Sequence, residues 1–274
     1  MSDTTTTSTA TDDQAYFDDL VSSATEHLTG GEVLLANLSG ERTDFIRFTK
    51  GDVRQAGTVE QRELSVDLVE GSCHVGGSFQ LTGDRGVDDA RLRGLVEQLR
   101  EQRRLVPEDP FLLYNTQPTT TDRVESGDVP EPGAALADIR NAASGKDLVG
   151  IYASGDTFSG FANSLGQRNW FQSATFNLDW SFYLHADKAA KTLYAGFQWD
   201  DDEFARKVDW SSRQLAALER DPVDLSPGDY RTYLAPAALQ ELVELMSWYG
   251  AFGKRALETK QTPLLKLNLG EASL

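Results

Sequence analysis

Two stretches in the first half of the chain have the spacing of an amphipathic helix. In residues 13–28 and 87–104, apolar side chains recur every three or four positions and mostly polar ones lie between them. This spacing places the apolar side chains on one side of a helix. The buried stripe of the second helix is expected to contain Leu92, Leu95, Val96 and Leu99. Each helix can therefore cover one face of a sheet.

Extended segments lie between these helices. Four short segments are rich in aliphatic or aromatic residues: 33–38, 45–48, 63–69 and 73–81. In the third, Leu64, Val66 and Leu68 alternate with polar residues. A period of two is typical of an antiparallel sheet that buries one face. The order of helix, strands and helix predicts an α+β layer.

The second half of the chain repeats this mixture of elements. A helix over 134–143 precedes a strand that begins at Asp147. From Gln172 to Trp199 the chain alternates between apolar and polar residues, which predicts a long hairpin. The acidic run 200–203 then begins a helix that extends to Glu219, because acidic side chains favour the first turn of a helix.

These elements predict the α+β class, with two domains of antiparallel sheet covered by helices. The expected divisions are a disordered tail over 1–12, an amino-terminal α+β domain over 13–114, a linker over 115–133 and a central α+β domain over 134–235. The tail is mostly Thr, Ser and Asp, and the linker contains several Pro and Gly residues, so neither has the pattern of a core. The central domain is expected to end in a short strand over 230–234.

The charge of the chain limits its partners. The 274 residues include 43 Asp and Glu against 26 Lys and Arg, which gives a formal net charge of −17. Nucleic acids and anionic membranes are bound by clusters of Lys and Arg, so neither is an expected partner. Two interpretations of the acidity stay open: a solvated surface that favours solubility, or electrostatic attraction of a basic peptide.

Metal ligands are scarce in this sequence. The three histidines, His27, His74 and His185, are far apart along the chain. Helical zinc motifs need two imidazoles about one turn apart, so this chain is not expected to hold zinc or another cofactor by itself. Cys73 and His74 are adjacent, but neighbouring side chains of a strand point to opposite faces. A single cysteine also excludes an internal disulfide.

The most distinctive stretch is 150–185, where a segment of small residues leads into NSLGQRN and then into several aromatic residues. Five residues in it are candidates for binding an extended peptide: Ser159, Asn163, Gln167, Arg168 and Trp170. The alternative is a purely structural turn, since Asn and Gly favour turns and an Arg beside a Trp can form a surface cation–π pair.

This stretch, with its N-S-x-G segment at 163–166, resembles the central region of the TldD/PmbA family, also called modulators of DNA gyrase. TDFIRFTKGDVRQAG at 43–57 is similar to a hairpin of that family's amino-terminal domain, and PGDYRTYLAPAALQELVELMSWYG at 227–250 is similar to a second signature. The resemblance implies a two-subunit cytoplasmic metallopeptidase. It also implies that 236–274 begins a β-rich carboxy-terminal domain, most of which this chain lacks.

The catalytic branch of that family carries His-Glu-x-x-x-His, and this sequence does not. The resemblance therefore points to the non-zinc, TldE or PmbA-like branch: a non-catalytic, peptide-binding subunit. Its partner would be a zinc-bearing TldD-like homologue in a heterodimer, or a second copy in a homodimer, and zinc would be held by the partner.

Two alternatives to that role stay open. One is a stand-alone binding or regulatory module of the gyrase-modulator type, without peptidase activity. The other is an orphaned fragment with no activity. A cytoplasmic location is expected in each case, because the sequence has no basic leader followed by an apolar run and no apolar stretch of membrane-spanning length.

Overall fold

A computed structural model of the chain describes residues 9–185, 187–248 and 250–273. The chain forms two compact units. The first extends to Asp109 and continues from Tyr114 to Asp221, and the second consists of Pro110–Leu113 and the residues from Pro222 onward. Most of the predicted tail, residues 1–8, lies outside the described residues, and the first helix begins at Thr9.

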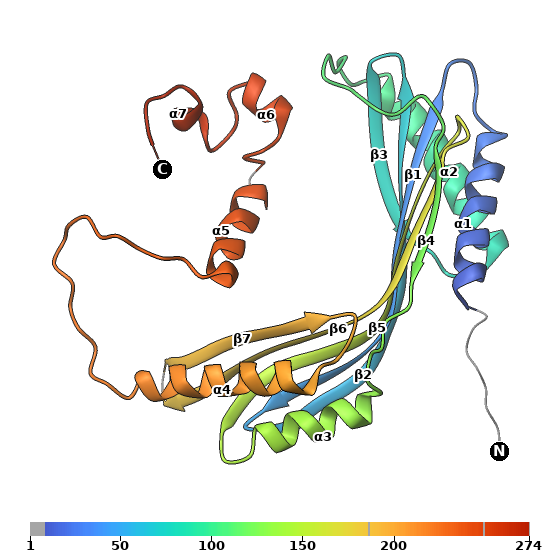
Figure 1. The fold of residues 1–274 in the computed structure, drawn as a ribbon. Helices are drawn as coiled ribbons and strands as arrows, with labels where there is room; N and C mark the ends of the chain where they lie inside the picture. The colour runs from blue at the N-terminus through green and yellow to red at the C-terminus, as the bar shows by residue number, and fades with distance from the viewer. Residues whose placement is uncertain (1–8, 186, 249, 274) are drawn as a thin grey trace, which may run out of the picture. The chain divides into compact units, whose positions relative to one another are not determined.

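The first unit is built on one sheet of seven strands (Figure 1). The strands are β1 (Val33–Thr49), β2 (Asp52–Glu70), β3 (Cys73–Gln80), β4 (Thr120–Glu125), β5 (Asp147–Asn163), β6 (Arg168–His185) and β7 (Lys188–Gly196). Their order is β3-β2-β1-β5-β6-β4, and β7 also pairs with β6. Every pairing is antiparallel except that of β4 with β6, which is parallel. The predicted α+β class is confirmed.

Strand β1 is longer than the sequence pattern indicates. Separate strands are expected over 33–38 and 45–48, but β1 runs without a break through the polar segment 39–44. This segment lies between β2 and β5, so its backbone groups are paired on both sides. Gly40 leaves space for the ring of Phe158, which a Cβ at that position would approach to 2.3 Å. Hydrogen bonding by both neighbours therefore keeps a polar stretch extended.

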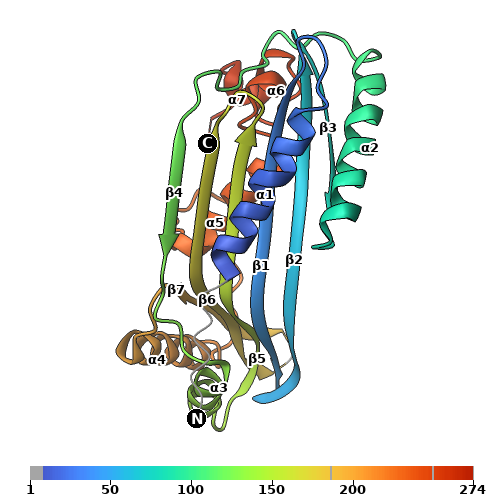
Figure 2. The same ribbon diagram turned by 90° about the vertical axis from the view of Figure 1, so that its right-hand side faces the viewer.

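Four helices pack on the sheet: α1 (Thr9–Thr25), α2 (Arg85–Arg103), α3 (Pro132–Ala142) and α4 (Asp201–Ala217). Two apolar clusters result. One contains Phe17 and Leu92 from α1 and α2, and the other contains Ile139 and Phe204 from α3 and α4. In Figure 2, α1 lies across the long strands β1 and β5.

All four helices cover the same face of the sheet. On β1, the first cluster uses Leu34, Ala36 and Leu38 and the second uses Ile46 and Phe48, which are all even-numbered residues. The buried residues of β5 and β6 in both clusters are also even-numbered. Since successive side chains of a strand alternate between faces, the odd-numbered residues of β1, β5 and β6 project from the opposite face, which none of the helices among this unit's described residues covers. We call this the open face.

The structure divides the chain differently from the sequence pattern. Both helical pairs share one continuous sheet, and the boundary between the compact units falls at Pro222. Residues 115–133, the predicted linker, contain β4 and the start of α3. The Thr-rich composition of this segment resembles a linker, but 120–125 pairs along one edge of β6.

The second unit contains α5 (Pro236–Trp248), α6 (Lys254–Glu258) and α7 (Leu265–Asn268). The strand expected over 230–234 is absent, since residues 222–235 form neither a helix nor a strand. LLKLNL, which has the pattern of a strand edge, lies largely in α7, where local backbone bonds replace those that a neighbouring strand would supply. In the part of the chain that the structure describes, no helix is long and apolar enough to cross a membrane.

Candidate functional site

The NSLGQRN segment forms the turn between β5 and β6. Asn163 is only 1% exposed, and its Oδ1 accepts hydrogen bonds from the backbone N–H groups of Leu165 and Gln167, both at 3.0 Å. Its Nδ2 donates to the carbonyl of Asn115 at 3.4 Å. Gln167 accepts from Asn115 Nδ2 at 3.1 Å and donates to Asn169 Oδ1 at 2.7 Å. The amide groups of Asn163 and Gln167 therefore organise the turn and the segment beside it.

Arg168 and Trp170 lie on the helix-covered side of the sheet. Arg168 Nη1 donates to the carbonyls of Asn163 and Gln167, at 2.9 and 2.7 Å, and its Nε lies 3.3 Å from Asp18 of α1. Burial raises the pKa of Asp18, although Arg168 opposes that shift. Trp170 is 3% exposed and stacks on Phe158 with ring centroids 5.5 Å apart. Arg168 and Trp170 therefore make separate contacts, and not the cation–π pair of the structural alternative.

Ser159 is the one residue of the five candidates that lines a cavity on the open face. The structure therefore does not bring the five together. The cavity is a groove of about 400 Å³, and its lining includes Gly40 and Phe158. Eight further residues, from strands β1, β2, β3, β5 and β6, line it: Ser39, Glu41, Gln61, Glu63, Gln80, Thr157, Ser159 and Phe171.

Strand register arranges these side chains in rows across the sheet. In one row, Gln80 lies opposite Glu63, Glu63 opposite Ser39, Ser39 opposite Ser159, and Ser159 opposite Phe171. In the next row, Gln61, Glu41 and Thr157 are neighbours. Neighbouring strands are about 4.8 Å apart, so each row is a continuous series of side chains. Ser39 and Ser159 have the smallest of these eight side chains, and we call this pair the floor of the groove.

The groove presents several kinds of recognition group. Its hydroxyl and amide groups can donate and accept hydrogen bonds, while the carboxylates only accept. At one end, Phe171 is 36% exposed, and the guanidinium carbon of Arg123 lies 5.5 Å from the centroid of its ring. A mostly polar groove with an aromatic end suits an extended polymer that carries both polar and apolar groups.

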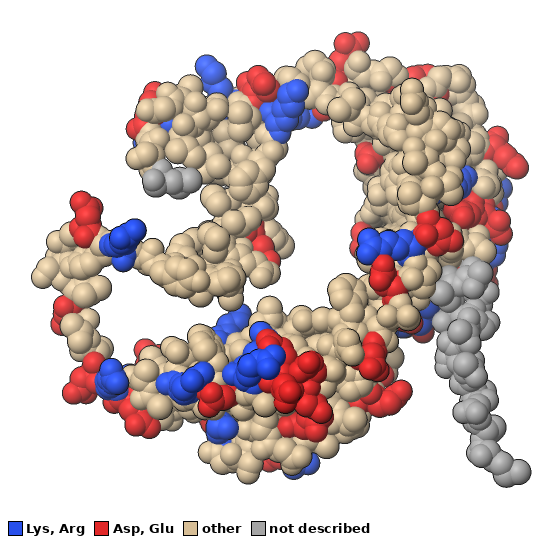
Figure 3. Space-filling model, in the orientation of Figure 1, with Lys and Arg blue, Asp and Glu red and all other residues tan. Residues whose placement is uncertain are grey.

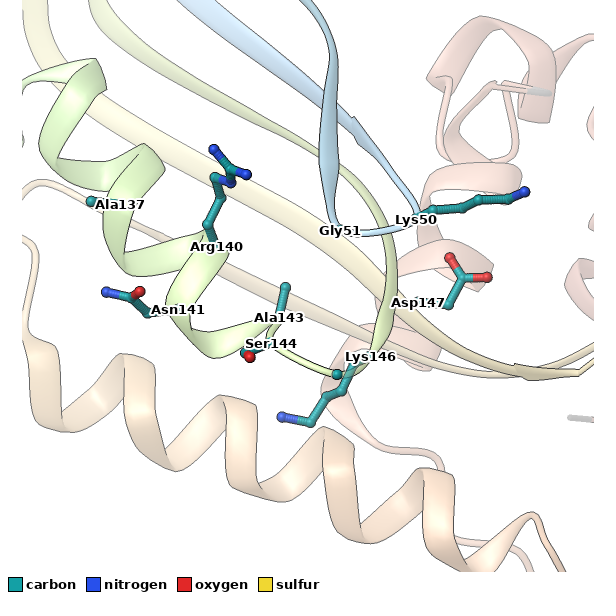
Figure 4. A pocket seen from close by; sticks show the side chains of 10 residues that line it. Lys50, Gly51, Ala137, Arg140, Asn141, Ala143, Ser144, Lys146 and Asp147 are labelled. Carbon is teal, nitrogen blue, oxygen red and sulfur yellow. The ribbon is translucent and has the colours of Figure 1, made fainter.

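A second cavity, of about 830 Å³, lies where the turn between β1 and β2 meets the end of α3. It includes the basic residues Lys50, Arg140 and Lys146. Figure 4 shows the side chains of Lys50 and Lys146 pointing away from one another. Lys146 Nζ donates to the carbonyl of Ala142 at 3.0 Å, and Arg140 lies 3.2 Å from Asp52. These bases do not converge on a common point, so this cavity is a weaker candidate than the groove.

Elsewhere on the first unit, acidic and basic side chains are interspersed. Figure 3 shows both signs of charge along α4. Arg206 lies 2.6 Å from Glu203, and Arg213 lies 3.2 Å from Asp209. Within the described residues, no group of three or more His, Cys, Asp or Glu side chains could hold a metal ion.

Solved structures that are similar to this one include those of two proteins. One is a protein from Bacteroides thetaiotaomicron described as a candidate modulator of DNA gyrase, with a TM-score of 0.67 and 13% identity over 93% of this chain and 60% of its own. The other is TldE from Thermococcus kodakarensis, with a TM-score of 0.52 and 11% identity over 73% of this chain and 47% of its own. This chain thus covers less than two thirds of the length of either protein. No family model and no curated protein matches the sequence.

These similarities define the class of fold: a long antiparallel sheet with helices on one face, as in gyrase-modulator structures. More particularly, it is the fold of the TldD/TldE/PmbA type, which confirms the resemblance that the sequence motifs indicate. At these low identities the likeness concerns the fold alone.

Most residues of the groove are missed by reasoning from motifs. Glu41, Gln61, Glu63 and Gln80 belong to ordinary polar stretches, and Phe171 is one of many aromatic residues. One signal is present in the sequence: acidic residues occupy odd positions at 41 and 63 while arginines occupy even positions at 42 and 62. That signal is informative only once the strands and their register are known.

Proposed function

We propose that this chain is a non-catalytic subunit that binds extended, unfolded peptides for a zinc metallopeptidase of the TldD/TldE type. The observation that carries the proposal is the groove on the open face, which has Ser159 in its floor. All four helices of the first unit pack on the other face, so the groove is not filled by an element of that unit.

The chemistry of the groove supports a peptide as its ligand. A peptide backbone presents alternating donors and acceptors that need partners when water is displaced. Ser39, Ser159 and Gln61 offer both kinds of group, and Phe171 offers an apolar surface to a side chain. No covalent step is assigned to these residues; their role is to bind and align the peptide.

In this proposal the hydrolysis occurs on a partner. The sequence has no His-Glu-x-x-x-His motif, so the partner would be a TldD-like homologue that holds zinc, or the complex would contain a second copy of this chain. In the heterodimer the homologue would hold the zinc and supply the hydrolytic chemistry, while this chain would bind and align the peptide. A cytoplasmic location is part of the same proposal.

Affinity purification of this protein from its native cell extract tests the proposal. We expect a relative with the zinc motif to copurify, and we expect the eluate to cleave an unfolded peptide until a chelator is added. Purification of this chain without such a relative, together with an eluate that cleaves no peptide before or after addition of zinc, would contradict the subunit role.

A stand-alone regulatory module is the second candidate, and the description of the Bacteroides thetaiotaomicron protein as a gyrase modulator favours it. Such a module would act without a peptidase. Inhibition or stimulation of DNA supercoiling by the purified chain would support it, whereas peptide cleavage in the copurified complex would favour the subunit. The net charge of −17 makes direct DNA binding by this chain unfavourable.

A further inference from the structure

At the groove, glutamates and arginines that are adjacent in the sequence of β1 and β2 lie on opposite faces of the sheet. Arg42 and Arg62 are even-numbered and lie on the helix-covered face, where both contact Asp13 of α1. Glu41 and Glu63 are odd-numbered and line the groove on the open face. Because adjacent residues of a strand point to opposite faces, the positive charges of Arg42 and Arg62 lie away from the groove, and the negative charges of Glu41 and Glu63 lie in it.

Neither groove carboxylate is neutralised by a base. Glu41 accepts hydrogen bonds from Gln61 Nε2 and, at 2.9 Å, from Thr43 Oγ1. Glu63 accepts from Gln80 Nε2 at 3.2 Å. All of these donors are neutral, and among the described residues neither glutamate forms an ion pair. Each ionised carboxylate has about four lone-pair sites, so both retain capacity for a further donor.

Glu32 is a buried carboxylate whose charge is compensated within the chain, in contrast to Glu41 and Glu63. Its side chain is 1% exposed and lies 2.7 Å from Arg100 and 3.0 Å from Arg103. Among the described residues that line the groove, by contrast, none is Lys or Arg. A cationic group brought by a ligand would therefore meet two carboxylates whose charge is not already compensated.

We propose that the groove selects peptides that carry a Lys or Arg side chain, whose cation binds between Glu41 and Glu63. The two glutamates are diagonal neighbours on paired strands, a position in which Cβ atoms are about 7 Å apart, so one ammonium or guanidinium group can reach both. This inference rests on the proposed peptide-binding function and adds the chemical class of the preferred substrate.

The test compares three fluorescein-labelled, unstructured peptides that differ at one central position: Lys, norleucine or Glu. Each is titrated with the full chain, and binding is followed by fluorescence anisotropy. Because exposed ion pairs strengthen binding only modestly, we expect the Lys peptide to bind about 5- to 10-fold more tightly than the norleucine peptide. The preference should decrease when NaCl is raised, because salt screens exposed charges.

Substitutions assign the preference to the groove. Glu41→Gln with Glu63→Gln should remove the preference, so that the Lys and norleucine peptides bind with equal affinity. A circular dichroism spectrum and a urea midpoint equal to those of the wild type show that the variant is folded. Glu41→Lys with Glu63→Lys should shift the preference to the Glu peptide. The matched control, Glu97→Gln with Glu101→Gln, removes two exposed charges from α2 and should keep the preference for Lys.

Failure of this inference differs from failure of the proposed function. Equal binding of the Lys and norleucine peptides, or a Lys preference that survives Glu41→Gln with Glu63→Gln, would overturn the inference and leave peptide binding in place. Absence of binding by all three peptides would overturn both.

Discussion

Glu32 is held by two arginines at the junction of α2 with the start of β1. Its carboxylate accepts from Arg100 Nε at 2.7 Å and from Arg103 Nη1 at 3.0 Å, and the N–H of Thr29 donates to it at 2.9 Å. The hydrogen bond from Arg100 is the largest cause that lowers the pKa of Glu32 from 4.5 to about 2, against the opposing effect of burial. The charged form is therefore stabilised by folding.

This lowered pKa predicts how stability depends on pH. The contribution of Glu32 is complete above its unfolded pKa of 4.5 and is lost as the pH falls towards about 2. Glu32→Gln should lower the free energy of unfolding by about 2–4 kcal/mol at pH 7. This is on the low side for a broken buried ion pair, because Arg103 keeps its contact with Glu70. Urea unfolding at pH 7 and pH 2.5 should show a smaller difference between wild type and variant at the lower pH.

The matched control for that prediction is Glu101→Gln, which breaks an exposed pair with Arg104. We expect it to change the free energy of unfolding by less than about 1 kcal/mol at either pH. A difference between wild type and Glu32→Gln that does not change with pH would contradict the assignment.

Gly155 allows β5 to lie close to β1. Its φ is +146°, and a Cβ at this position would lie 2.2 Å from the carbonyl oxygen of Arg42. Gly155→Ala should destabilise the protein by at least about 2 kcal/mol, because both the strained backbone and the steric overlap must be relieved. Gly94→Ala, in the interior of α2 with nothing within 4 Å, should instead stabilise it by about 0.5–1 kcal/mol in the same urea unfolding experiment.

At the scale of elements, Asp88 connects β3, α2 and α1. Its carboxylate accepts from the N–H and hydroxyl groups of Thr82, from the N–H of Gly83 and, at 2.7 Å, from the hydroxyl of Tyr16. These hydrogen bonds lower the pKa of Asp88 although burial opposes them, and burial together with Asp88 raises the pKa of Tyr16. One side chain therefore fixes the turn before α2 and the position of α1.

Replacing Asp88 should cost more than removing the helix cap four residues earlier. We expect Asp88→Ala to lower the free energy of unfolding by about 3 kcal/mol, since it leaves several buried donors without a partner. Asp84→Ala removes one N-cap bond, to Val87 N at 3.0 Å, and should cost about 1 kcal/mol. Chemical denaturation of the two variants checks this order, and equal losses would contradict it.

The sequence predicts most elements of the first unit but not how they combine. The apolar period of α2 and the alternation of Leu64, Val66 and Leu68 in β2 are sufficient to predict these two elements. An amphipathic helix and a half-buried strand each have a strong local pattern in the sequence. The continuity of β1 through 39–44 was not predictable in this way, since it depends on pairing with β2 and β5. The same holds for β4, which pairs with a strand more than forty positions away.

The candidate site was predicted only in part, for a similar reason. Asn163 and Gln167 have the composition of a binding loop, but their side chains bond to the turn itself. Ser159 lies in the groove, although nothing local distinguishes it from other serines of the chain. Its neighbours Glu41 and Glu63 come from other strands, and only the register brings them together.

At the scale of the whole molecule, the two compact units differ in how much of their chain is hydrogen-bonded in helices and strands and buried in an apolar core. The first unit has a seven-stranded sheet and two apolar clusters. Residues 222–235, at the start of the second unit, are exposed and belong to no helix or strand. Opening of such a segment requires little free energy, which makes it a preferred site for proteolysis.

Limited proteolysis should therefore cut first within 222–235. Tyr230, Arg231 and Tyr233 offer sites to chymotrypsin and trypsin there, and all three residues are exposed. Mass spectrometry should detect an early product that ends in this segment. At the same time point, the peptide bonds that follow the arginines of β1 and β2 should not be cleaved. Initial cleavage within those strands would show that the first unit is not the more stable part of the chain.

The central claim is that the open face binds unfolded peptide through the groove. The most direct measurement is the affinity of one labelled unfolded peptide for the wild type, for Ser159→Tyr, which fills the floor of the groove, and for Asn177→Tyr. Asn177 is an exposed residue of β6 on the same face but outside the groove, so it is a matched control. We predict that Ser159→Tyr weakens binding at least about tenfold, or 1.4 kcal/mol, while Asn177→Tyr retains it. Equal affinities of the three proteins, or no binding by the wild type, would contradict the account.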